Sequence, residues 1–325
     1  MGEVLLDIQG LKTQFPTQHG VVRAVDGVDL TVCRGETLGL VGESGCGKTV
    51  IGLSIMGLIE SPGRIVQGSI LLNGEDLAKK SATELRKLRG DRVSMIFQDP
   101  TVTLNPVLKI GDQVAEVFRY HRGMDRKEAK QKAEEVLFLV GIPSPRERMN
   151  RYPFEFSGGM QQRVIIAIAV ALDPELIIAD EPTTALDLTI QAQILDILKN
   201  LKTEKDSAIM LITHDMGVVA ELCETVAVAY AGNIVEHAGI ESILEHPKHP
   251  YTIGLMNSVP KLEDKSRSRL KPIPGVLADS IAPPNGCKFN SRCTYVQARC
   301  FSERPLMREI APGHKLACHL NLQEE

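Results

Sequence analysis

One octapeptide constrains this chain more than any other part of it, the P-loop formed by residues 42–49. It fits the pattern G-x-x-x-x-G-K-[ST] and stands between a short apolar run, Thr37–Val41, and a predicted helix. Glycines let the backbone turn so that successive N–H groups reach phosphate oxygens, and the helix points its positive end at the same anion. Lys48 can reach the β- and γ-phosphates, and the Thr49 hydroxyl can bind Mg²⁺. The motif reads Gly42, Glu43, Ser44, Gly45, Cys46, Gly47, Lys48, Thr49.

A second element suits a nucleotide site. Leu176–Ala179 is an apolar run typical of a buried strand, and it ends in Asp180 and Glu181. Asp180 can hold Mg²⁺ directly or through water, and Glu181 can orient and polarise the attacking water. Such a run usually marks a strand leaving the core, but its position after a P-loop favours the catalytic interpretation.

Alternating strand-like and helix-like segments predict an α/β fold. Residues 105–172 read as mostly helical, with Asp125–Leu139 as the clearest amphipathic segment, and Asn73-Gly74 marks a tight turn. Tyr251–Ser258 is a further helix candidate. Strands are expected at Val4–Phe15, Gly27–Val32, Thr37–Val41, Gly68–Leu72, Arg92–Phe97, Leu176–Ala179 and Ala208–Ile212.

Composition and charge exclude several classes of protein. The 325 residues carry a net charge of −4, which argues against a partner bound through phosphate-backbone neutralisation, so no nucleic acid is expected. The longest apolar run, Val164–Leu172, is shorter than the about 20 residues of a membrane-spanning helix. The first residues lack the pattern of a secretory signal. We therefore expect a cytosolic protein with reduced thiols.

A Ser-Gly-Gly motif opens a helix between the two phosphate elements, at residues 157–163. A serine hydroxyl and glycine N–H groups at a helix N-terminus make a second anion site. Here the sequence resembles an ATP-binding cassette (ABC) ATPase, whose signature is usually written Leu-Ser-Gly-Gly-Gln. Phe156 and Met160 depart from that form, but neither change removes the hydroxyl or the glycine amides.

The resemblance implies further site residues. Gln98 is similar to the Q-loop glutamine, Thr184–Asp187 to the D-loop at the dimer interface, and His214 to the switch histidine that contacts the γ-phosphate. Phe15 is similar to the aromatic residue that stacks on adenine. The resemblance assigns catalysis to Glu181, His214 and Gln98, and Mg²⁺ binding to Thr49, Gln98 and Asp180. ATP binding falls to Phe15, the P-loop residues Gly42, Glu43, Ser44, Gly45, Cys46, Gly47, Lys48 and Thr49, and to Ser157, Gly158, Gly159, Gln161 and Asp187.

The family architecture implies a P-loop NTPase with a RecA-like core, an antiparallel β subdomain and an α-helical subdomain. We expect the nucleotide-binding domain over residues 1–245, with its helical subdomain over 99–165. A linker with a short helix follows over 246–285, and a Cys-rich extension that binds a metal or cluster over 286–325. In the family two cassettes join head to tail around two ATP molecules, and their closure drives separate transmembrane subunits.

The end of the chain narrows the branch of the family. His249-Pro250-Tyr251-Thr252 and the segment 284–293 are similar to the C-terminal extension of oligopeptide and dipeptide importer ATPases. This implies two transmembrane permeases, a second ATPase in a heterodimer (or a homodimer in isolation), and indirectly an extracytoplasmic solute-binding protein. The chain would then lie peripherally on the cytoplasmic face of the plasma membrane. An importer of nickel or a metal chelate is the alternative.

Four of the 7 cysteines crowd the end of the chain. Disulfides are disfavoured in a reducing cytosol, and structural zinc sites usually show a tight C-x₂₋₄-C pair that is missing here. A [4Fe–4S] cluster takes four thiolates, and some relatives with this extension carry one. We expect the cluster as a structural staple, with Zn²⁺ or unliganded thiols as alternatives. The ligands would be Cys287, Cys293, Cys300 and Cys318.

Other functions explain fewer of the motifs. Soluble ABC ATPases acting on nucleic acid or ribosomes typically have two cassettes or long coiled coils, and this chain shows one P-loop and no sustained heptads. If the chain were a P-loop kinase, the Ser-Gly-Gly motif, Asp187 and His214 would have no shared function. A non-catalytic regulatory cassette is disfavoured by Glu181 and His214.

Overall fold

The structure is a computed structural model that describes residues 2–184, 186–258 and 272–320. The chain forms two compact units. The predicted D-loop residue Ala185 and much of the predicted linker, residues 259–271, lie outside the described residues. The first unit comprises Met1–Leu5, Val32–Thr37 and Lys79–Leu211, and the second comprises Leu6–Thr31, Leu38–Ala78 and Ile212–Glu325.

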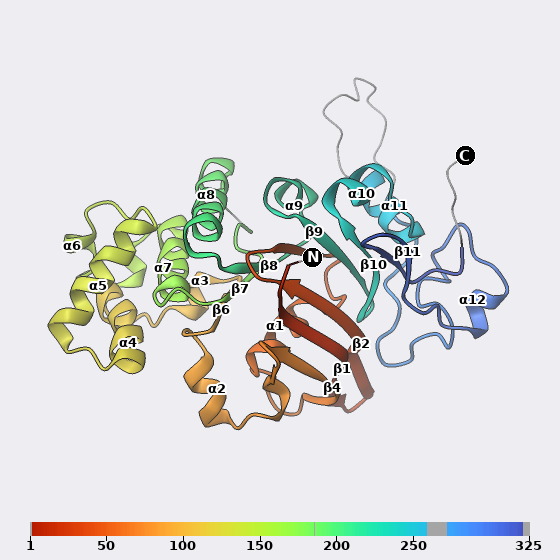
Figure 1. The fold of residues 1–325 in the computed structure, drawn as a ribbon, viewed down its shortest axis with the longest axis horizontal. Helices are drawn as coiled ribbons and strands as arrows, with labels where there is room; N and C mark the ends of the chain where they lie inside the picture. Colours follow the sequence, from red (N-terminus) through yellow and green to blue (C-terminus); the bar gives the residue numbers. More distant parts are fainter. Residues whose placement is uncertain (1, 185, 259–271, 321–325) are drawn as a thin grey trace, which may run out of the picture. The chain divides into compact units, whose positions relative to one another are not determined.

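The first unit combines buried parallel strands with a group of helices (Figure 1). β6 pairs in parallel with β7, with Ile96 opposite Ala179, and β8 continues this sheet beyond β7. Every residue of β6, β7 and β8 is buried, as expected for parallel strands covered on both faces. The elements are α2 (Ala82–Leu88), β6 (Val93–Ile96), α3 (Pro100–Thr103), α4 (Ile110–Arg122), α5 (Arg126–Leu139), α6 (Pro145–Arg148), a 3₁₀ turn at Pro153–Glu155, α7 (Gly158–Val170), β7 (Leu176–Asp180), α8 (Leu188–Lys205) and β8 (Ala208–Thr213).

Local sequence explains the predicted helix over Asp125–Leu139. The Asp125 side chain accepts hydrogen bonds from the N–H groups of Lys127 (2.7 Å) and Glu128 (2.9 Å), which completes a capping box. Ala129, Ala133 and Leu137 are buried at a spacing of four residues and form the apolar stripe. The prediction is confirmed, and this stripe packs α5 into the helical group.

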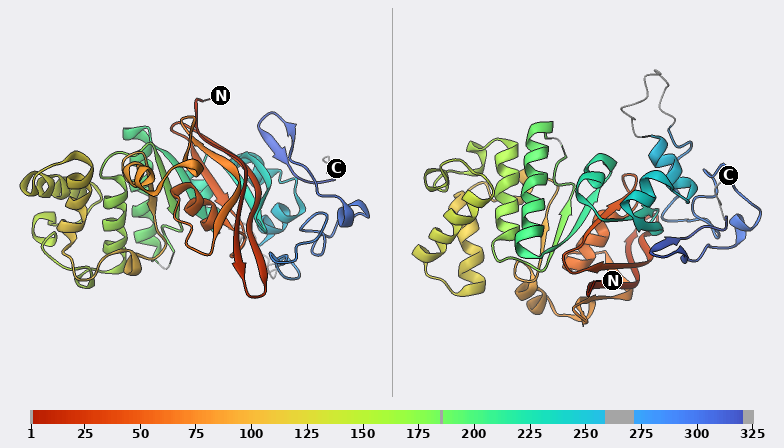
Figure 2. Two further views of the ribbon diagram at one scale, coloured as in Figure 1. Left: turned by 90° about the horizontal axis from the view of Figure 1, so that it is seen from below. Right: turned by 45° about the horizontal axis from the view of Figure 1, so that its top comes forward.

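The second unit contains an antiparallel sheet in the order β2-β1-β4-β5. β1 and β2 form a long hairpin, seen in the left view of Figure 2. Asn73 (φ 49°) and Gly74 (φ 78°) make the expected tight turn between β4 and β5. The first β-strands are β1 (Val4–Thr17), β2 (Gly20–Cys33), β4 (Arg64–Leu72) and β5 (Glu75–Asp76), followed by a 3₁₀ turn at Leu77–Lys79.

A second sheet in this unit carries the P-loop. Its order is β11-β12-β10-β9-β3-β8, in which β3 pairs in parallel with β9 and β9 antiparallel with β10. The strand β8 straddles the two units, because Ala208–Leu211 belong to the first and its last two residues to the second. The elements are β3 (Thr37–Val41), α1 (Lys48–Met56), α9 (Met216–Leu222), β9 (Thr225–Tyr230), β10 (Asn233–Gly239), α10 (Ile240–Glu245), α11 (Pro250–Asn257), α12 (Arg299–Ser302), β11 (Arg308–Ala311) and β12 (His314–Leu316).

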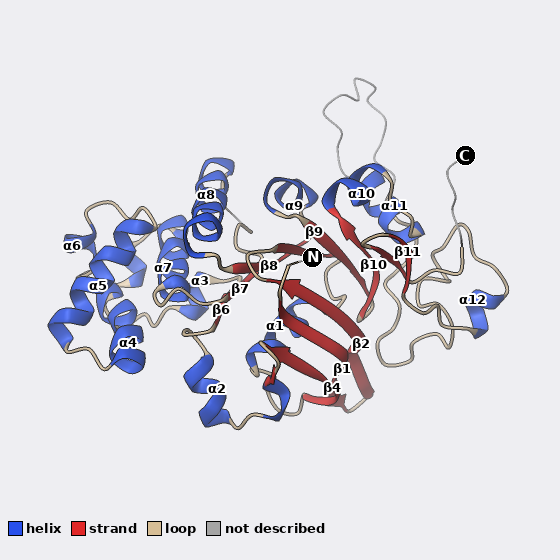
Figure 3. Ribbon diagram, in the orientation of Figure 1, coloured by secondary structure: helices blue, strands red, loops and turns tan. Residues whose placement is uncertain are grey.

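The Cys-rich tail, residues 286–320, is mostly loop between α12, β11 and β12 (Figure 3). β12 pairs antiparallel with β10, with Glu236 opposite Leu316, so the end of the chain extends the sheet that carries the P-loop. The fold class is therefore the expected P-loop α/β fold with an antiparallel sheet.

Candidate active site

The P-loop follows a wholly buried strand and precedes a helix, as the motif requires. β3 ends at Val41, and α1 begins at Lys48. Gly47 caps the helix with a φ of 101°, a conformation that other residues rarely adopt. A side chain at Gly47 would put its Cβ 2.2 Å from the carbonyl oxygen of Ala24, so the position has no room for one. The loop is shaped by close backbone packing.

Lys48 lies inside the loop and is 6% exposed. Its Nζ donates to the carbonyl oxygens of Gly42 (2.7 Å) and Glu43 (3.1 Å). This arrangement holds the ammonium group among the turns of the loop, where phosphates of a nucleotide would lie. Burial raises the pKa of the neighbouring Cys46 thiol, so Cys46 stays protonated and serves as a small buried filler.

Three other predicted residues belong to the second unit. Thr49 is exposed in the first turn of α1, and His214 is exposed directly after β8. Asp215, which follows His214, caps α9 by accepting from the Gly217 N–H (2.8 Å). The Phe15 ring is half-buried and packs against Gly63, where a Cβ would lie 2.4 Å from the ring.

The first unit brings two predicted catalytic residues together. Gln98 and Glu181 each lie two residues beyond the paired positions Ile96 and Ala179 of β6 and β7. The Gln98 Nε2 donates to the Glu181 Oε2 at 3.0 Å, and the Thr184 hydroxyl donates to the same oxygen at 2.8 Å. These two bonds orient the carboxylate at the ends of the strands.

Asp180 and Glu181 have different environments. Asp180 ends β7 and is 3% exposed, whereas Glu181 leaves the strand with a φ of 46°. A positive φ outside glycine is uncommon and turns the chain sharply. The turn separates a buried carboxylate suited to a metal ion from a more accessible one suited to water.

The Ser-Gly-Gly motif forms the N-terminus of α7. Ser157 caps the helix, and its Oγ accepts from the Met160 N–H at 3.4 Å. Gly158 is exposed with open space around it, while a Cβ at Gly159 would lie 2.8 Å from Ile190. Asp187 caps α8 in the same way by accepting from the Ile190 N–H at 2.9 Å.

Gln161, which we expect among the ATP-binding residues, has a buried side chain. Its Nε2 donates to the carbonyl oxygens of Pro153 (2.9 Å) and Phe156 (3.3 Å), and its role at the nucleotide stays a prediction. Gln161 therefore supports the loop that leads into Ser157. Phe156 is 6% exposed, so the aromatic residue at the usual leucine position is a core residue.

The four tail cysteines are free thiols, as are the other three, all within the described part of the chain. Burial, with a smaller effect of the nearby Cys318, Cys300 and Cys293, raises the pKa of Cys287 to about 11. Cys287, Cys293 and Cys318 each accept from the backbone N–H of the residue two positions later in the chain. These hydrogen bonds lower the pKa of the three thiols and oppose the effect of burial. In the Cys318 case the Leu320 N–H lies 3.4 Å from the sulfur.

The fit of these thiols to a metal is partial. Among the described residues no group of three or more His, Cys, Asp or Glu side chains is arranged to hold a metal ion, so the expected preformed metal site is not confirmed. All four thiols nevertheless lie within electrostatic range of one another.

Two residues from the segments that resemble the C-terminal extension touch the P-loop, a contact that the sequence alone does not predict. The guanidinium of Arg292 forms two bonds with the Glu43 carboxylate, and the Glu43 N–H donates to the Tyr251 hydroxyl at 2.8 Å. The bond to Glu43 raises the pKa of Arg292 above its ordinary value, against the effect of burial. No motif in the sequence marks either contact, because the partners are more than 200 residues apart.

Comparisons with known proteins agree with this geometry. Residues 25–184 match the family described as ABC transporter, and residues 235–300 match the one described as oligopeptide/dipeptide transporter, C-terminal region. The chain is 49% identical to a probable peptide ABC transporter ATP-binding protein of Sinorhizobium fredii, over 97% of this chain and 95% of the relative. It is 47% identical to the oligopeptide transport ATP-binding protein OppD of Bacillus subtilis (95% and 87% covered) and 44% identical to the dipeptide transport ATP-binding protein DppD of Escherichia coli (98% and 98% covered).

Solved structures show the same fold. A dimeric ATP-binding cassette in a post-hydrolysis state, bound to ADP and Pi, superimposes with a TM-score of 0.66 at 27% identity. The match covers 73% of this chain and 99% of that cassette. In the described part of the chain no helix is long and apolar enough to cross a membrane.

Proposed function

The chain belongs to the ATP-binding subunits of oligopeptide and dipeptide ABC transporters, and we propose that it hydrolyses ATP to energise import of dipeptides or oligopeptides across the plasma membrane. One observation carries the proposal: a single chain joins the ABC segment, residues 25–184, to the C-terminal region typical of peptide transporters, residues 235–300. The identity of 44–49% extends over nearly the whole chain, which supports the same function for the ABC segment and for the C-terminal region as in these relatives.

The residues of the second unit bind the nucleotide in this proposal. The P-loop amides and Lys48 hold the phosphates, Phe15 stacks on the adenine, and His214 contacts the γ-phosphate. Mg²⁺, when bound, neutralises charge on the phosphates, with Thr49, Gln98 and Asp180 as its proposed holders. The packing of Gly47 and the placement of Lys48 support the phosphate role.

Glu181 is the proposed catalytic carboxylate. It accepts the proton of the attacking water and so makes that water a better nucleophile. The donors Gln98 (3.0 Å) and Thr184 (2.8 Å) both reach its Oε2 and fix the orientation of the carboxylate. By family resemblance we propose that Gln98 also links the site to a membrane partner.

The partners follow from family membership. We propose a second ATPase subunit, whose nucleotide would face Ser157, Gly158, Gly159 and Asp187, together with two transmembrane permeases and an extracytoplasmic solute-binding protein. The chain then works peripherally at the cytoplasmic face of the membrane. The proposed division is a cassette over residues 1–245 with helical residues 99–165, a linker over 246–285 and the Cys-rich extension over 286–325.

A [4Fe–4S] cluster held by Cys287, Cys293, Cys300 and Cys318 completes the proposal. Its support is the electrostatic proximity of the four thiols and the backbone amides directed at three of them. A bound cluster would staple a tail too short to build its own core. Anaerobic purification should give a brown protein with about four iron atoms per chain. A colourless protein with one zinc ion would contradict the cluster.

Co-purification tests the transport role. The chain is affinity-tagged in its own cell, extracted in mild detergent, and the associated proteins are identified. Two membrane permeases and a second ATPase are expected, with a peptide-binding protein encoded beside them. A binding protein loaded with nickel or a metal chelate would establish the alternative cargo, and association with ribosomes or DNA alone would contradict transport.

A further inference from the structure

Arg292 joins the Cys-rich tail to the P-loop. Its Nη1 and Nη2 donate to the two carboxylate oxygens of Glu43 at 2.6 and 2.9 Å, and its side chain is 3% exposed. We propose that Arg292 is a positioning residue for nucleotide binding: it holds Glu43, and through it the P-loop, in the place that the phosphates require.

Glu43 is the point where three parts of the second unit meet. Its carboxylate binds Arg292 of the tail, its N–H donates to the Tyr251 hydroxyl of α11, and its carbonyl oxygen accepts from Lys48 Nζ. Tyr251 is fully buried. A displacement of Glu43 therefore moves a hydrogen-bond partner of the lysine that binds phosphate.

The Arg292 side chain is fixed from several sides. Its Nε donates to the Pro274 carbonyl oxygen at 2.8 Å, and its guanidinium lies 5.8 and 5.9 Å from the ring centres of Tyr230 and Phe289. A planar guanidinium that is held on a carboxylate and lies beside two rings has little freedom to adjust. Arg292 thus presents a rigid support to Glu43.

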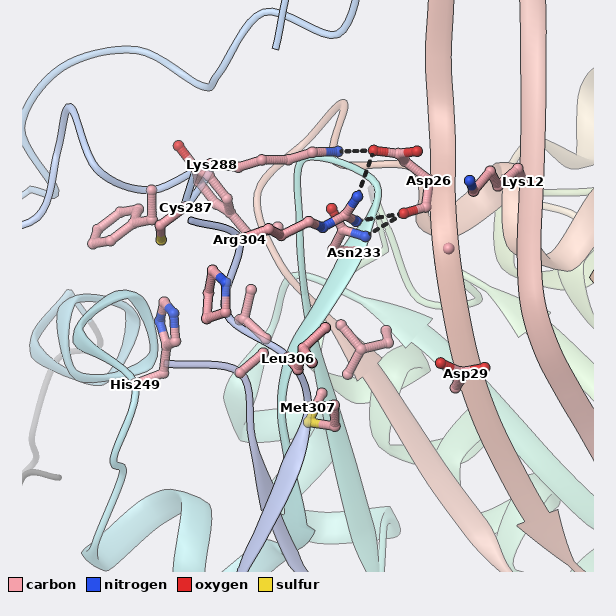
Figure 4. A pocket seen from close by; sticks show the side chains of 17 residues that line it. Lys12, Asp26, Asp29, Asn233, His249, Cys287, Lys288, Arg304, Leu306 and Met307 are labelled. Carbon is pink, nitrogen blue, oxygen red and sulfur yellow. Dashed lines mark hydrogen bonds and ion pairs between the residues drawn. The ribbon is translucent and has the colours of Figure 1, made fainter. Parts of the chain in front are cut away.

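A second anchor supports the P-loop from the same tail. Lys288 Nζ donates to the Ala231 carbonyl oxygen at 2.7 Å and pairs with Asp26 at 3.0 Å. Figure 4 shows Lys288 and Arg304 converging on Asp26. Gly232, which follows Ala231, donates its N–H to the Cys46 carbonyl oxygen of the P-loop at 2.8 Å. The tail therefore contacts both the P-loop and the turn that supports it.

Packing of the tail and binding of nucleotide are thermodynamically coupled through these contacts, so one can regulate the other. If packing of the tail favours the binding conformation of the P-loop, bound nucleotide must favour packing of the tail by the same factor. The two anchors, Lys288 and Arg292, are neighbours of the cysteines Cys287 and Cys293. The state of the tail then sets nucleotide affinity. This inference rests on nucleotide binding by the chain but not on the metal that the cysteines hold.

Titration of the full chain with Mg-ADP, which is not hydrolysed, tests the proposal by calorimetry. Arg292→Ala and Glu43→Ala should each weaken binding about 10- to 100-fold, since small misplacements of a site cost that much. The double variant should be no weaker than either single one, because both remove the same contact. Arg299→Ala is the matched control, an exposed arginine of the same tail that contacts His319.

Further measurements distinguish a positioning role of Arg292 from a general loss of folded structure in the variants. Thermal unfolding is measured for every variant, and Glu43→Ala carries the test if Arg292→Ala fails to fold. In ATP hydrolysis KM should rise while kcat changes little, and Arg292→Lys should recover part of the affinity because it keeps the charge without the fork. Folded variants that bind Mg-ADP as the unmodified chain does would overturn the proposal, as would additive effects in the double variant. Failure of the unmodified chain to bind Mg-ADP would instead contradict the proposed function.

Discussion

The P-loop and the Cys-rich tail belong to one unit but are held in place by different forces. The P-loop is fixed by buried strands and by backbone approaches so close that Gly47 has no room for a Cβ. The tail has little regular structure and is fixed by buried polar side chains, namely Lys288, Arg292 and His314, each less than a tenth exposed. Substitutions in the site should therefore change chemistry and binding directly. Substitutions in the tail and at the start of α11 should change stability, and Arg292 should act on nucleotide affinity only through Glu43.

Glu181→Gln is expected to have the largest effect. The amide keeps the size of the side chain but cannot accept the proton of the attacking water, so ATP turnover should fall by about 10²- to 10⁴-fold. Phosphate release measures the loss, and Mg-ADP binding should stay unchanged. Glu135→Gln on the exposed face of α5 is the matched control. A variant that retains most of its turnover would move the catalytic carboxylate elsewhere.

Lys48→Ala should weaken nucleotide binding itself. It removes the ammonium group that the Gly42 and Glu43 carbonyls hold in the P-loop, and affinity for Mg-ADP should fall by at least about tenfold. Equilibrium titration measures the change, with Lys132→Ala on α5 as a control. Wild-type affinity in the Lys48 variant would contradict the placement of the phosphates.

His314→Ala should act on stability. The His314 Nε2 lies 2.8 Å from the carboxylate of Glu236, which is fully buried and also accepts from the N–H groups of Lys248 and His249. Removal of one partner of a buried carboxylate should cost about 1–3 kcal/mol in the free energy of unfolding. Urea denaturation measures it, and His319→Ala serves as the control. An unchanged midpoint would show that the contact between His314 and Glu236 does not hold the tail.

His249→Asn should produce the smallest effect, a change in pH dependence. Burial lowers the pKa of His249 to about 3 from an ordinary value of 6.5, so the folded chain keeps the ring neutral while the unfolded chain takes up a proton below pH 6.5. The free energy of unfolding should therefore fall as pH drops from 6.5 towards 3.

Asparagine can still accept from the Tyr251 N–H, as His249 Nδ1 does at 3.0 Å, but it does not titrate. The slope of stability against pH should be shallower in the variant, measured by urea titrations at several pH values. His19→Asn, in an exposed turn, is the control. Equal slopes in both variants would show that His249 does not carry the acid sensitivity.

The same comparison explains what could be predicted from the sequence. The P-loop, β7 with Asp180 and Glu181, and the cap at Ser157 follow from local patterns, since each is built by neighbours in the chain. The sequence predicts that Gln98 and Glu181 both follow the ends of strands, but it does not predict the hydrogen bond between them. The contacts of Arg292 and Tyr251 with Glu43 depend on tertiary packing, and so does the burial of Gln161, which a motif does not reveal.

Uptake by the assembled transporter tests the central claim most directly. The chain is reconstituted in proteoliposomes with its permeases, its partner ATPase and the peptide-loaded binding protein, and ATP hydrolysis and peptide uptake are measured together. Both activities should depend on peptide, and both should be lost with Glu181→Gln. Hydrolysis that is indifferent to peptide, or uptake that survives the substitution, would contradict it.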